Sequence, residues 1–254
     1  MLEAIALQKH FRQGFFSQRT VRAVDGVSLC LTAGETLGLT GNSGSGKSTL
    51  ARMLAGLIKP SAGRILYQDV ELPTSSPPFF TPRRRPLQMI FQNPLLAFDP
   101  RQQLRQALLE PLLTHRLISS TAQGLDRLSG LLHAVGLEEE LLLRYPHQIS
   151  GGQAQRLTIA RALSLEPELL IADEPAAMLD VVAQAQVMAL LHQLQNRTGI
   201  GMLLISHDTE LLRASASRVL VMVNGQITAA GTPAAVFGPP ATDLFSLRRQ
   251  LTTT

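Results

Sequence analysis

Residues 41–48, GNSGSGKS, have the types and the spacing that bind the phosphate groups of a nucleotide. They fit the pattern G-x-x-x-x-G-K-[ST], whose glycines let the backbone curl until successive N–H groups point at an anion. Lys47 can reach the β- and γ-phosphates, and the hydroxyl of Ser48 suits Mg²⁺, which takes few protein ligands. The alternatives are a glycine turn without a ligand and a dinucleotide site, whose G-x-G-x-x-G pattern is not met. The residues predicted to bind nucleotide here are Gly41, Asn42, Ser43, Gly44, Ser45, Gly46, Lys47, Ser48 and Thr49.

A pair of acids follows the apolar segment 169–172. If that segment is a parallel strand, Asp173 and Glu174 lie at the carboxyl edge of the sheet, beside the phosphate loop. Asp173 is predicted to hold the Mg²⁺ sphere. Glu174 is predicted to act as general base on the attacking water, a role worth about 10²–10⁴-fold in rate. The alternative is an acidic helix start, and the pairing with the phosphate loop favours the first interpretation.

A second glycine segment, ISGGQ at residues 149–153, precedes a helical pattern. Ser150 is placed as an N-cap, and Gly151 and Gly152 leave backbone N–H groups bare for an anion. The alternative is a capped helix without a ligand. One chain does not need two phosphate sites for one nucleotide. The second site, which includes Gln153, is therefore predicted to serve a nucleotide bound to another subunit.

Alternating strands and helices must position these residues. Residues 1–40 alternate and turn like short strands, and the last of them, 37–40, runs into the phosphate loop and the helix after it. Residues 101–147 repeat leucine at helical spacing, which predicts an all-helical insertion. Segments 169–172 and 202–205 suit central parallel strands. Residues 71–86 are rich in proline and serine and are predicted to be irregular. Their run Arg83-Arg84-Arg85 is predicted to be a solvated face, with docking to a lipid or a partner as the alternative.

The composition sets outer limits on the class of protein. The chain has 254 residues, enough for one α/β domain or for a core with an inserted subdomain. Its 45% hydrophobic and 17% charged residues argue against disorder, and no apolar run approaches the roughly 18 residues of a membrane helix. We expect no signal peptide, and the single Cys30 excludes an intrachain disulfide framework and favours a reducing, cytoplasmic setting. Aromatic residues, at 4%, are too few for an obvious stacking platform for single-stranded nucleic acid.

Together these segments resemble the ATPase subunits of ABC transporters over nearly the whole chain. Residues 41–48 resemble the Walker A loop of that family, 149–153 its signature motif, and Asp173 and Glu174 its Walker B acid and catalytic glutamate. Gln92 matches the Q-loop, Asp180 the D-loop and His207 the switch histidine. The resemblance implies that Gln92 contacts the metal and the γ-phosphate, and that His207 contacts the γ-phosphate. A P-loop kinase or GTPase is one alternative function, but it would leave residues 149–153 without a ligand.

Several short stretches are similar to a narrower group, the importer ATPases for oligopeptides, dipeptides and nickel. These stretches are residues 91–94, 99–101, 110–112 and 145–148. Members of that group that carry peptides commonly end in a longer tail with a cysteine cluster. Residues 237–254 are short and hold no cysteine, which favours the nickel or metal-chelate branch over peptides.

Two further departures from the family pattern concern the nucleotide site. The D-loop has Ala177-Met178 where Ser-Ala is usual, although Asp180 is kept. The aromatic residue that stacks on adenine is assigned to Phe11, next to His10, with Phe15 and Phe16 nearby.

The resemblance implies a P-loop NTPase (RecA-like) fold, with a parallel-sheet core, an antiparallel β subdomain and an inserted all-helical subdomain. Residues 1–90 and 151–254 are assigned to the nucleotide-binding core and 91–150 to the helical insertion, in one ABC ATPase domain of residues 1–254. The ligands implied are ATP and Mg²⁺. The partners implied are a second ATPase subunit, identical or different, two transmembrane permease subunits, and through them an extracytoplasmic substrate-binding protein, with no nucleic acid. The chain is expected at the cytoplasmic face of the inner membrane. The alternative is a soluble ABC-type ATPase that acts on nucleic acid or ribosomes.

Overall fold

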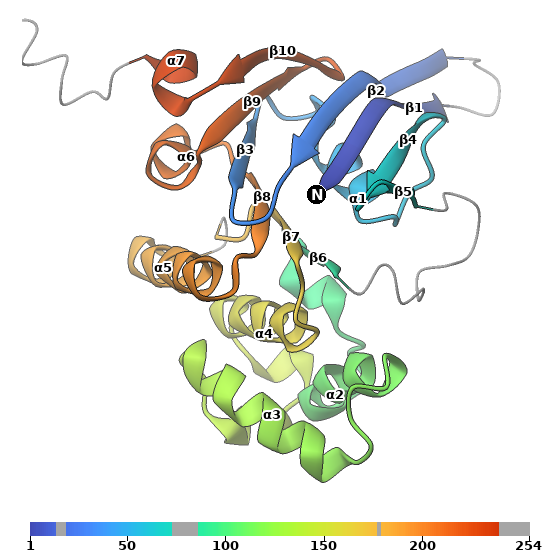
Figure 1. The fold of residues 1–254 in the computed structure, drawn as a ribbon. Coiled ribbons are helices and arrows are strands. Elements are labelled where there is room, and N and C mark those ends of the chain that lie inside the picture. The colour runs from blue at the N-terminus through green and yellow to red at the C-terminus, as the bar shows by residue number, and fades with distance from the viewer. Residues whose placement is uncertain (14–18, 73–85, 177–178, 239–254) are drawn as a thin grey trace, which may run out of the picture.

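The computed structural model describes residues 1–13, 19–72, 86–176 and 179–238. Two β-sheets and a group of helices make up the fold (Figure 1). Four of the sequence predictions fall outside the described residues. They concern the run Arg83-Arg84-Arg85, the pair Phe15 and Phe16, the D-loop pair Ala177-Met178, and residues 239–254 of the tail.

The central sheet has six strands in the order β10-β9-β3-β8-β7-β6. Its parallel strands are β3 (Thr36–Thr40), β6 (Leu87–Ile90), β7 (Leu169–Asp173), β8 (Gly201–Ile205) and β9 (Arg218–Val223), and β10 (Gln226–Gly231) pairs antiparallel at the edge. Every residue of β3, β7 and β8 is buried. Burial on both faces explains why these strands are continuous apolar runs in the sequence.

Alternate residues of the central strands face two separate cores. In β7, Leu170 and Ala172 pack with the helical layer, whereas Leu169 and Ile171 pack with the other sheet and α1 (Lys47–Leu54). This alternation follows from the two-residue period of a strand. The predicted parallel-sheet core with an antiparallel subdomain is confirmed.

The second sheet is antiparallel, in the order β2-β1-β4-β5. Its strands are β1 (Leu2–Gln13), β2 (Arg19–Leu31), β4 (Ala62–Tyr67) and β5 (Val70–Glu71). The prediction of short strands was wrong for the first two, which have 12 and 13 residues. Irregularities in their pairing, one of them beside Ala6 with φ 47°, interrupt the apolar alternation and let one long ribbon bend.

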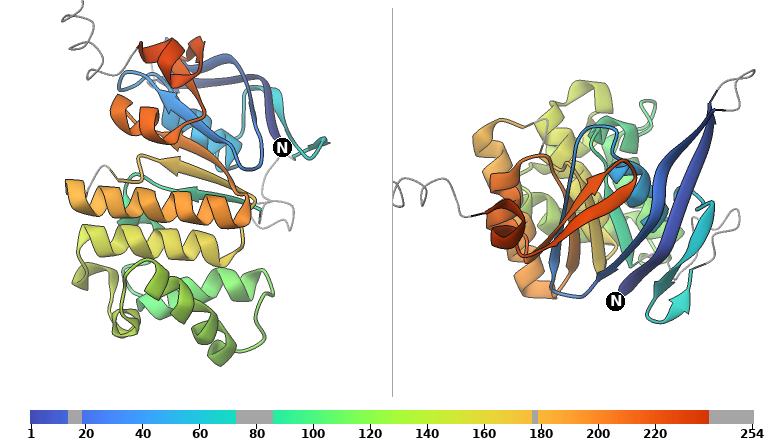
Figure 2. Two further views of the ribbon diagram at one scale, coloured as in Figure 1. Left: turned by 60° about the vertical axis from the view of Figure 1, so that its left-hand side comes forward. Right: turned by 90° about the horizontal axis from the view of Figure 1, so that it is seen from above.

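The helices form a layer on the central sheet and a separate group at one end of the molecule (Figures 1 and 2). The end group contains α2 (Leu104–Thr114) and α3 (Thr121–Ala134), and α4 (Gly151–Ser164) contacts both α3 and β6. The layer contains α5 (Val181–Thr198), with α6 (Thr209–Ser215) and α7 (Pro233–Phe237) following along the chain. In the part of the chain that the structure describes, 3₁₀ helices lie at Pro94–Ala97 (η2), Glu139–Leu143 (η3) and Pro146–Gln148 (η4).

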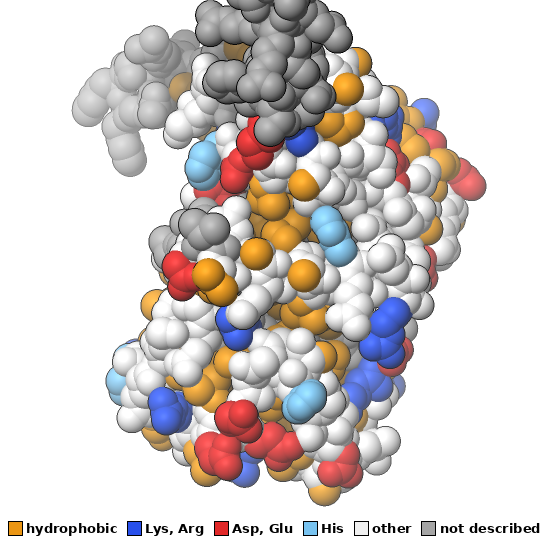
Figure 3. Space-filling model, turned by 90° about the vertical axis from the view of Figure 1, so that its left-hand side faces the viewer, with side chains coloured by type: hydrophobic (Ala, Val, Ile, Leu, Met, Phe, Trp, Pro, Cys, Tyr) orange, Lys and Arg blue, Asp and Glu red, His pale blue; other side chains and the backbone are white. Residues whose placement is uncertain are grey.

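Helix α5 has an outer surface with little charge. Arg197 is the one Lys, Arg, Asp or Glu in its 18 residues. Figure 3 accordingly shows few charged side chains along the middle of this face, and more of them at the helical end. Among the described residues, no helix is long and apolar enough to cross a membrane.

Candidate active site

The phosphate loop lies between the end of β3 and the start of α1, and it is wedged between two strands. A Cβ atom at Gly41, where φ is 148°, would lie 2.0 Å from the carbonyl oxygen of Met222 on β9. A Cβ atom at Gly46, where φ is 108°, would lie 2.0 Å from the carbonyl oxygen of Ala23 on β2. Only glycine combines these backbone angles with such close contacts. The sequence pattern therefore has a steric cause at both of its fixed glycines.

The N-terminus of α1 is open to an anion. Its N-cap residue, Gly46, has no side chain to accept from the first N–H groups of the helix. Those N–H groups carry partial positive charge and are satisfied by a phosphate group in proteins of this geometry. Lys47, the first residue of the helix, is 9% exposed, and its Nζ donates to the carbonyl oxygens of Gly41 (2.7 Å) and Asn42 (2.9 Å). The charge of Lys47 is thus held over the loop.

Asp173 lies at the carboxyl end of β7 and is only 3% exposed. Burial raises the pKa of this carboxyl above its ordinary value, while a hydrogen bond with Ser48 acts in the opposite direction. A carboxylate beside a hydroxyl is the donor set that Mg²⁺ takes from proteins, with water and phosphate oxygens supplying the other ligands. The two residues fit the predicted metal position, because a cation there would compensate the buried charge of Asp173.

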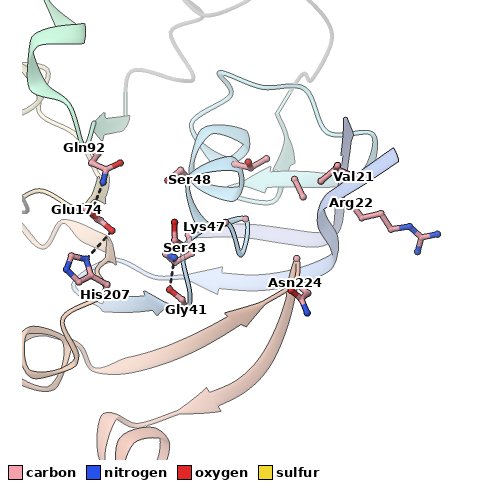
Figure 4. A pocket seen from close by; sticks show the side chains of 15 residues that line it. Val21, Arg22, Gly41, Ser43, Lys47, Ser48, Gln92, Glu174, His207 and Asn224 are labelled. Carbon is pink, nitrogen blue, oxygen red and sulfur yellow. Dashed lines mark hydrogen bonds and ion pairs between the residues drawn. The ribbon is translucent and has the colours of Figure 1, made fainter. Parts of the chain in front are cut away.

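The side chains of Gln92 and His207, from distant parts of the chain, both meet the carboxylate of Glu174. Its Oε2 accepts a hydrogen bond from Nε2 of Gln92 at 2.7 Å, and its Oε1 lies 3.3 Å from Nδ1 of His207. Figure 4 shows the three side chains in line at one end of the cleft. Parallel strands β6, β7 and β8 end at the same edge of the sheet, which brings these three positions together.

The backbone of Glu174 is in the left-handed region, with φ 49°. Its N–H donates to the carbonyl oxygen of Ile205 on β8 at 3.0 Å. A left-handed conformation costs a non-glycine residue about 1–2 kcal/mol, and such residues gather at functional sites. The bond to Ile205 fixes this conformation and aims the carboxylate toward the loop edge.

A cleft of about 510 Å³ joins the phosphate loop to this cluster. The predicted residues that line it are Gly41, Ser43, Gly44, Gly46, Lys47, Ser48, Thr49, Gln92, Glu174 and His207. No chemical pattern in the sequence pointed to the other residues that line it, which are Val21, Arg22, Ala23, Asn224 and Gly225. The Asn224-Gly225 pair, a favoured hairpin turn, was the one pattern that could have drawn attention to this wall.

The aromatic residue assigned to adenine lies beside the cleft wall rather than in it. Phe11 is 39% exposed on β1 and pairs across the sheet with Val21, which does line the cleft. Nζ of Lys9 lies 5.2 Å from the centre of the Phe11 ring. The stacking role of Phe11 stays a prediction.

The second predicted phosphate site does not line this cleft either. Ser150 caps α4 by accepting from the N–H of Gln153 at 3.2 Å, while Oε1 of Gln153 accepts from the N–H of Ser150 at 3.0 Å. Gly151 is exposed and Gly152 is half-buried at the same helix start. Asp180 caps α5 in the same way, through the N–H of Ala183. None of these five residues lines the cleft of its own chain.

The fold and this site define the class of P-loop nucleoside triphosphatases. A loop with an open helix N-terminus, a held lysine, a buried carboxylate and an oriented glutamate are the parts that phosphoryl transfer to water needs.

The chain belongs to the ABC transporter family, whose model matches residues 24–177. It is similar to the putative oligopeptide transport ATP-binding protein YkfD of Bacillus subtilis, with 45% identity over 91% of this chain and 71% of that protein. It is also similar to two Escherichia coli proteins. These are the oligopeptide transport ATP-binding protein OppF, with 43% identity over 94% of this chain and 74% of OppF, and the dipeptide transport ATP-binding protein DppF, with 41% over 94% and 72%.

Solved structures agree with this assignment. The dimeric ATP-binding cassette MJ0796, bound to ADP and Pi, superposes with a TM-score of 0.83 and 27% identity over 92% of this chain and 99% of that chain. The predicted P-loop NTPase fold is thereby confirmed. As a member of this family, the chain binds and hydrolyses ATP to drive transport, which sets aside the kinase or GTPase alternative.

Proposed function

We propose that this chain is the ATPase subunit of an importer for short peptides. The observation that carries the ATPase role is the meeting of Gln92, Glu174 and His207 at one end of a cleft that begins at the phosphate loop. The choice of peptides is supported by the relatives OppF and DppF and by a glutathione import protein, GsiA of Salmonella typhi, which is 44% identical over 90% of this chain. The shorter tail had favoured nickel, and the relatives named here favour peptides.

The residues of the cleft divide the work of hydrolysis. The loop N–H groups and Lys47 bind the β- and γ-phosphates, and Glu174 takes a proton from the attacking water. The water oxygen then bonds to the γ-phosphorus as the bond to the bridging oxygen breaks, which leaves ADP and phosphate. Gln92 and His207 orient the glutamate and contact the γ-phosphate end. Ser48 and Asp173, together with Gln92, would hold Mg²⁺, which would supply positive charge to the phosphate oxygens.

The signature segment, residues 149–153, is proposed to bind the nucleotide that a second ATPase subunit holds in its cleft. Ser150, Gly151, Gly152 and Gln153 lie outside the cleft of their own chain and present a helix start to solvent. A helix N-terminus attracts phosphate, so a second subunit placed head to tail would complete each site. The dimeric structures of MJ0796 support this arrangement. Asp180 would lie at the same contact, and residues 1–90 and 151–254 would form the core that closes around ATP.

The insertion, residues 91–150, is proposed to contact the permease subunits. A groove of about 320 Å³ lies between the core and the helices and is lined by Phe91, Pro111 and Arg161 among others. Phe91 lines the groove and precedes Gln92, whose side chain donates to Glu174. A permease segment bound in this groove would therefore contact the part of the chain that reaches Glu174. The proposed partners are two permease subunits and, through them, a substrate-binding protein. Bound to the permeases, the chain would lie at the cytoplasmic face of the membrane. A soluble role on nucleic acid is less well supported, because the relatives are transport proteins.

Two substitutions test the ATPase assignment. Lys47→Ala should abolish tight ATP binding, because it removes the cation over the loop. Glu174→Gln should keep ATP binding and lower turnover by at least about 10²-fold, the range of a lost general base. ATP binding is measured by titration and turnover by phosphate release, with Lys59→Ala, an exposed lysine outside the cleft, as control. Hydrolysis by Glu174→Gln at the parental rate would rule out this general base.

The cargo is tested separately, by comparing the uptake of a dipeptide with the uptake of nickel in membrane vesicles.

A further inference from the structure

Strands β9 and β10 are joined by a tight turn at one end of the cleft. Val223 pairs with Gln226, which leaves Asn224 and Gly225 as a two-residue loop. Both have positive φ, 48° and 84°. Two-residue hairpins of this kind favour Asn-Gly, because both residues tolerate the left-handed region. The sequence therefore specifies this turn, although no step of hydrolysis uses it.

The turn holds the phosphate loop through the backbone of Gly225. The N–H of Gly225 donates to the carbonyl oxygen of Ser45 at 2.9 Å. Its carbonyl oxygen accepts from the N–H of Asp25 on β2, also at 2.9 Å. Nε2 of Gln226 adds a bond of 3.2 Å to the carboxylate of Asp25. One residue of the turn thus ties the loop to the antiparallel sheet.

The turn packs closely against the backbone of β2. A Cβ atom at Gly225 would lie 3.0 Å from the carbonyl oxygen of Arg22 and 3.3 Å from that of Ala23. Ser45, the residue that the turn holds, is 5% exposed, and its Oγ lies 3.4 Å from Nζ of Lys47. A shift of the turn would therefore reach the lysine through Ser45.

We propose that Gly225 is a positioning residue for the phosphate loop, which it fixes in the shape that binds triphosphate. The inference rests on the proposed ATPase function and goes beyond it, because it assigns a role to a residue outside the motifs of the family. Gly225 acts through Ser45 and needs no contact with the nucleotide. Its loss should weaken binding of the phosphate groups themselves, and not only of the nucleoside.

The test compares two ligands on matched glycine variants of the full chain. Gly225→Ala adds a Cβ atom at a positive φ in tight contact with the backbone of β2, and Gly199→Ala adds one at φ 71° with nothing within 4 Å. Binding of ATP and of inorganic tripolyphosphate is measured by displacement of a fluorescent ADP analogue, with the melting temperature of each variant. Gly225→Ala should weaken both ligands by about fivefold or more, the effect of one net hydrogen bond, and Gly199→Ala should stay within about twofold of the parent.

Three outcomes would overturn the inference or separate it from the proposed function. Equal effects of Gly225→Ala and Gly199→Ala on both ligands would overturn it, as would a loss for ATP but not for tripolyphosphate. If Gly225→Ala does not fold, Gly225→Asn, which tolerates positive φ but adds the same Cβ atom, must show the same loss. Lys47→Ala is measured in parallel. Normal binding by Lys47→Ala would instead contradict the proposed function, whatever the glycine variants show.

Discussion

At the scale of single residues, Glu174 has both of its carboxylate oxygens engaged before any substrate binds. Gln92 donates to one oxygen and His207 lies beside the other. The left-handed backbone of Glu174 restricts the carboxylate further. A base that is already oriented does not need to be ordered during the reaction, which lowers the barrier to water attack. We infer that the two neighbours orient the base.

Replacing the histidine tests that role. His207→Ala should lower kcat by about 10²-fold, the lower end of the range for groups that assist proton transfer. ATP binding should change much less than kcat, because the side chain of His207 is 71% exposed and its bond in this structure is to Glu174. Steady-state phosphate release and ATP titration measure the two effects. The control is His133→Ala, an exposed histidine at the end of α3. A parental kcat for His207→Ala would show that this side chain does not assist the reaction.

Sequence patterns pointed to residues that carry a chemical group, whose roles stay predictions, and missed residues that line the cleft through shape. The positions of Lys47, Asp173 and Glu174 follow from side-chain type and from the strand that precedes each motif. Val21 on β2 and Gly225 in the β9–β10 turn belong to different sheets, which a bond from the N–H of Asp25 to the carbonyl oxygen of Gly225 holds together. No local sequence pattern reveals this contact. Phe11 was assigned from its place near the N-terminus, and its neighbour Val21 occupies the wall.

At the scale of elements, α4 is joined to the segment that follows Gln92. The guanidinium of Arg161 on α4 donates to the carbonyl oxygen of Ala97 in η2 and lies 6.0 Å above the ring of Phe98. Burial lowers the pKa of Arg161 below its ordinary value. A buried charge is retained only where hydrogen bonds and neighbouring groups compensate for lost water. This contact therefore fixes the helix that carries Ser150 to the loop that carries Gln92.

Removing the side chain of Arg161 should weaken the attachment of η2 to α4. Arg161→Ala leaves the carbonyl oxygen of Ala97 without its charged donor, and should lower the free energy of unfolding by about 2 kcal/mol. Urea denaturation measures the change. Arg64→Ala, at an exposed position on β4, should change it by less than about 0.5 kcal/mol. Equal stability of the two variants would mean that Arg161 does not hold η2 to α4.

The elements themselves were predictable to different degrees. Helices α2 and α3 lie inside the leucine-rich stretch that predicted them, because helical periodicity is a local signal. The length of β1 and β2 was missed, since bulges break the alternation that marks a single strand. The assignment of α4 to the core remains a prediction, and this helix contacts both α3 and β6.

At the scale of the whole molecule, the groove beside Phe91 is proposed to receive the permease. Leu96 in η2 is 79% exposed and precedes Ala97, which lines the groove. Leu96→Asp should abolish co-purification with the membrane subunits. ATP hydrolysis by the purified chain should stay unchanged, because Leu96 does not line the nucleotide cleft. The control is Val70→Asp, on the far sheet at 45% exposure. Normal co-purification of Leu96→Asp would place the permease contact elsewhere.

Two subunits are proposed to share each ATP, and Gly151→Asp should disrupt that shared site. A Cβ atom at Gly151 meets nothing within 4 Å, and an acid in the first turn favours a helix, so α4 should stay folded. The added carboxylate would repel a phosphate group of the nucleotide bound to the partner.

The measurement is ATP hydrolysis per chain across a range of protein concentrations, with any ATPase subunit that co-purifies. If the sites are shared, the parental rate per chain should rise with concentration. Gly151→Asp should lower that rate by at least about tenfold, the effect of about 1.4 kcal/mol at the transition state, while ATP still binds in its own cleft. A rate per chain that is constant down to concentrations where the chain is a monomer, and that Gly151→Asp leaves unchanged, would contradict the sharing of ATP.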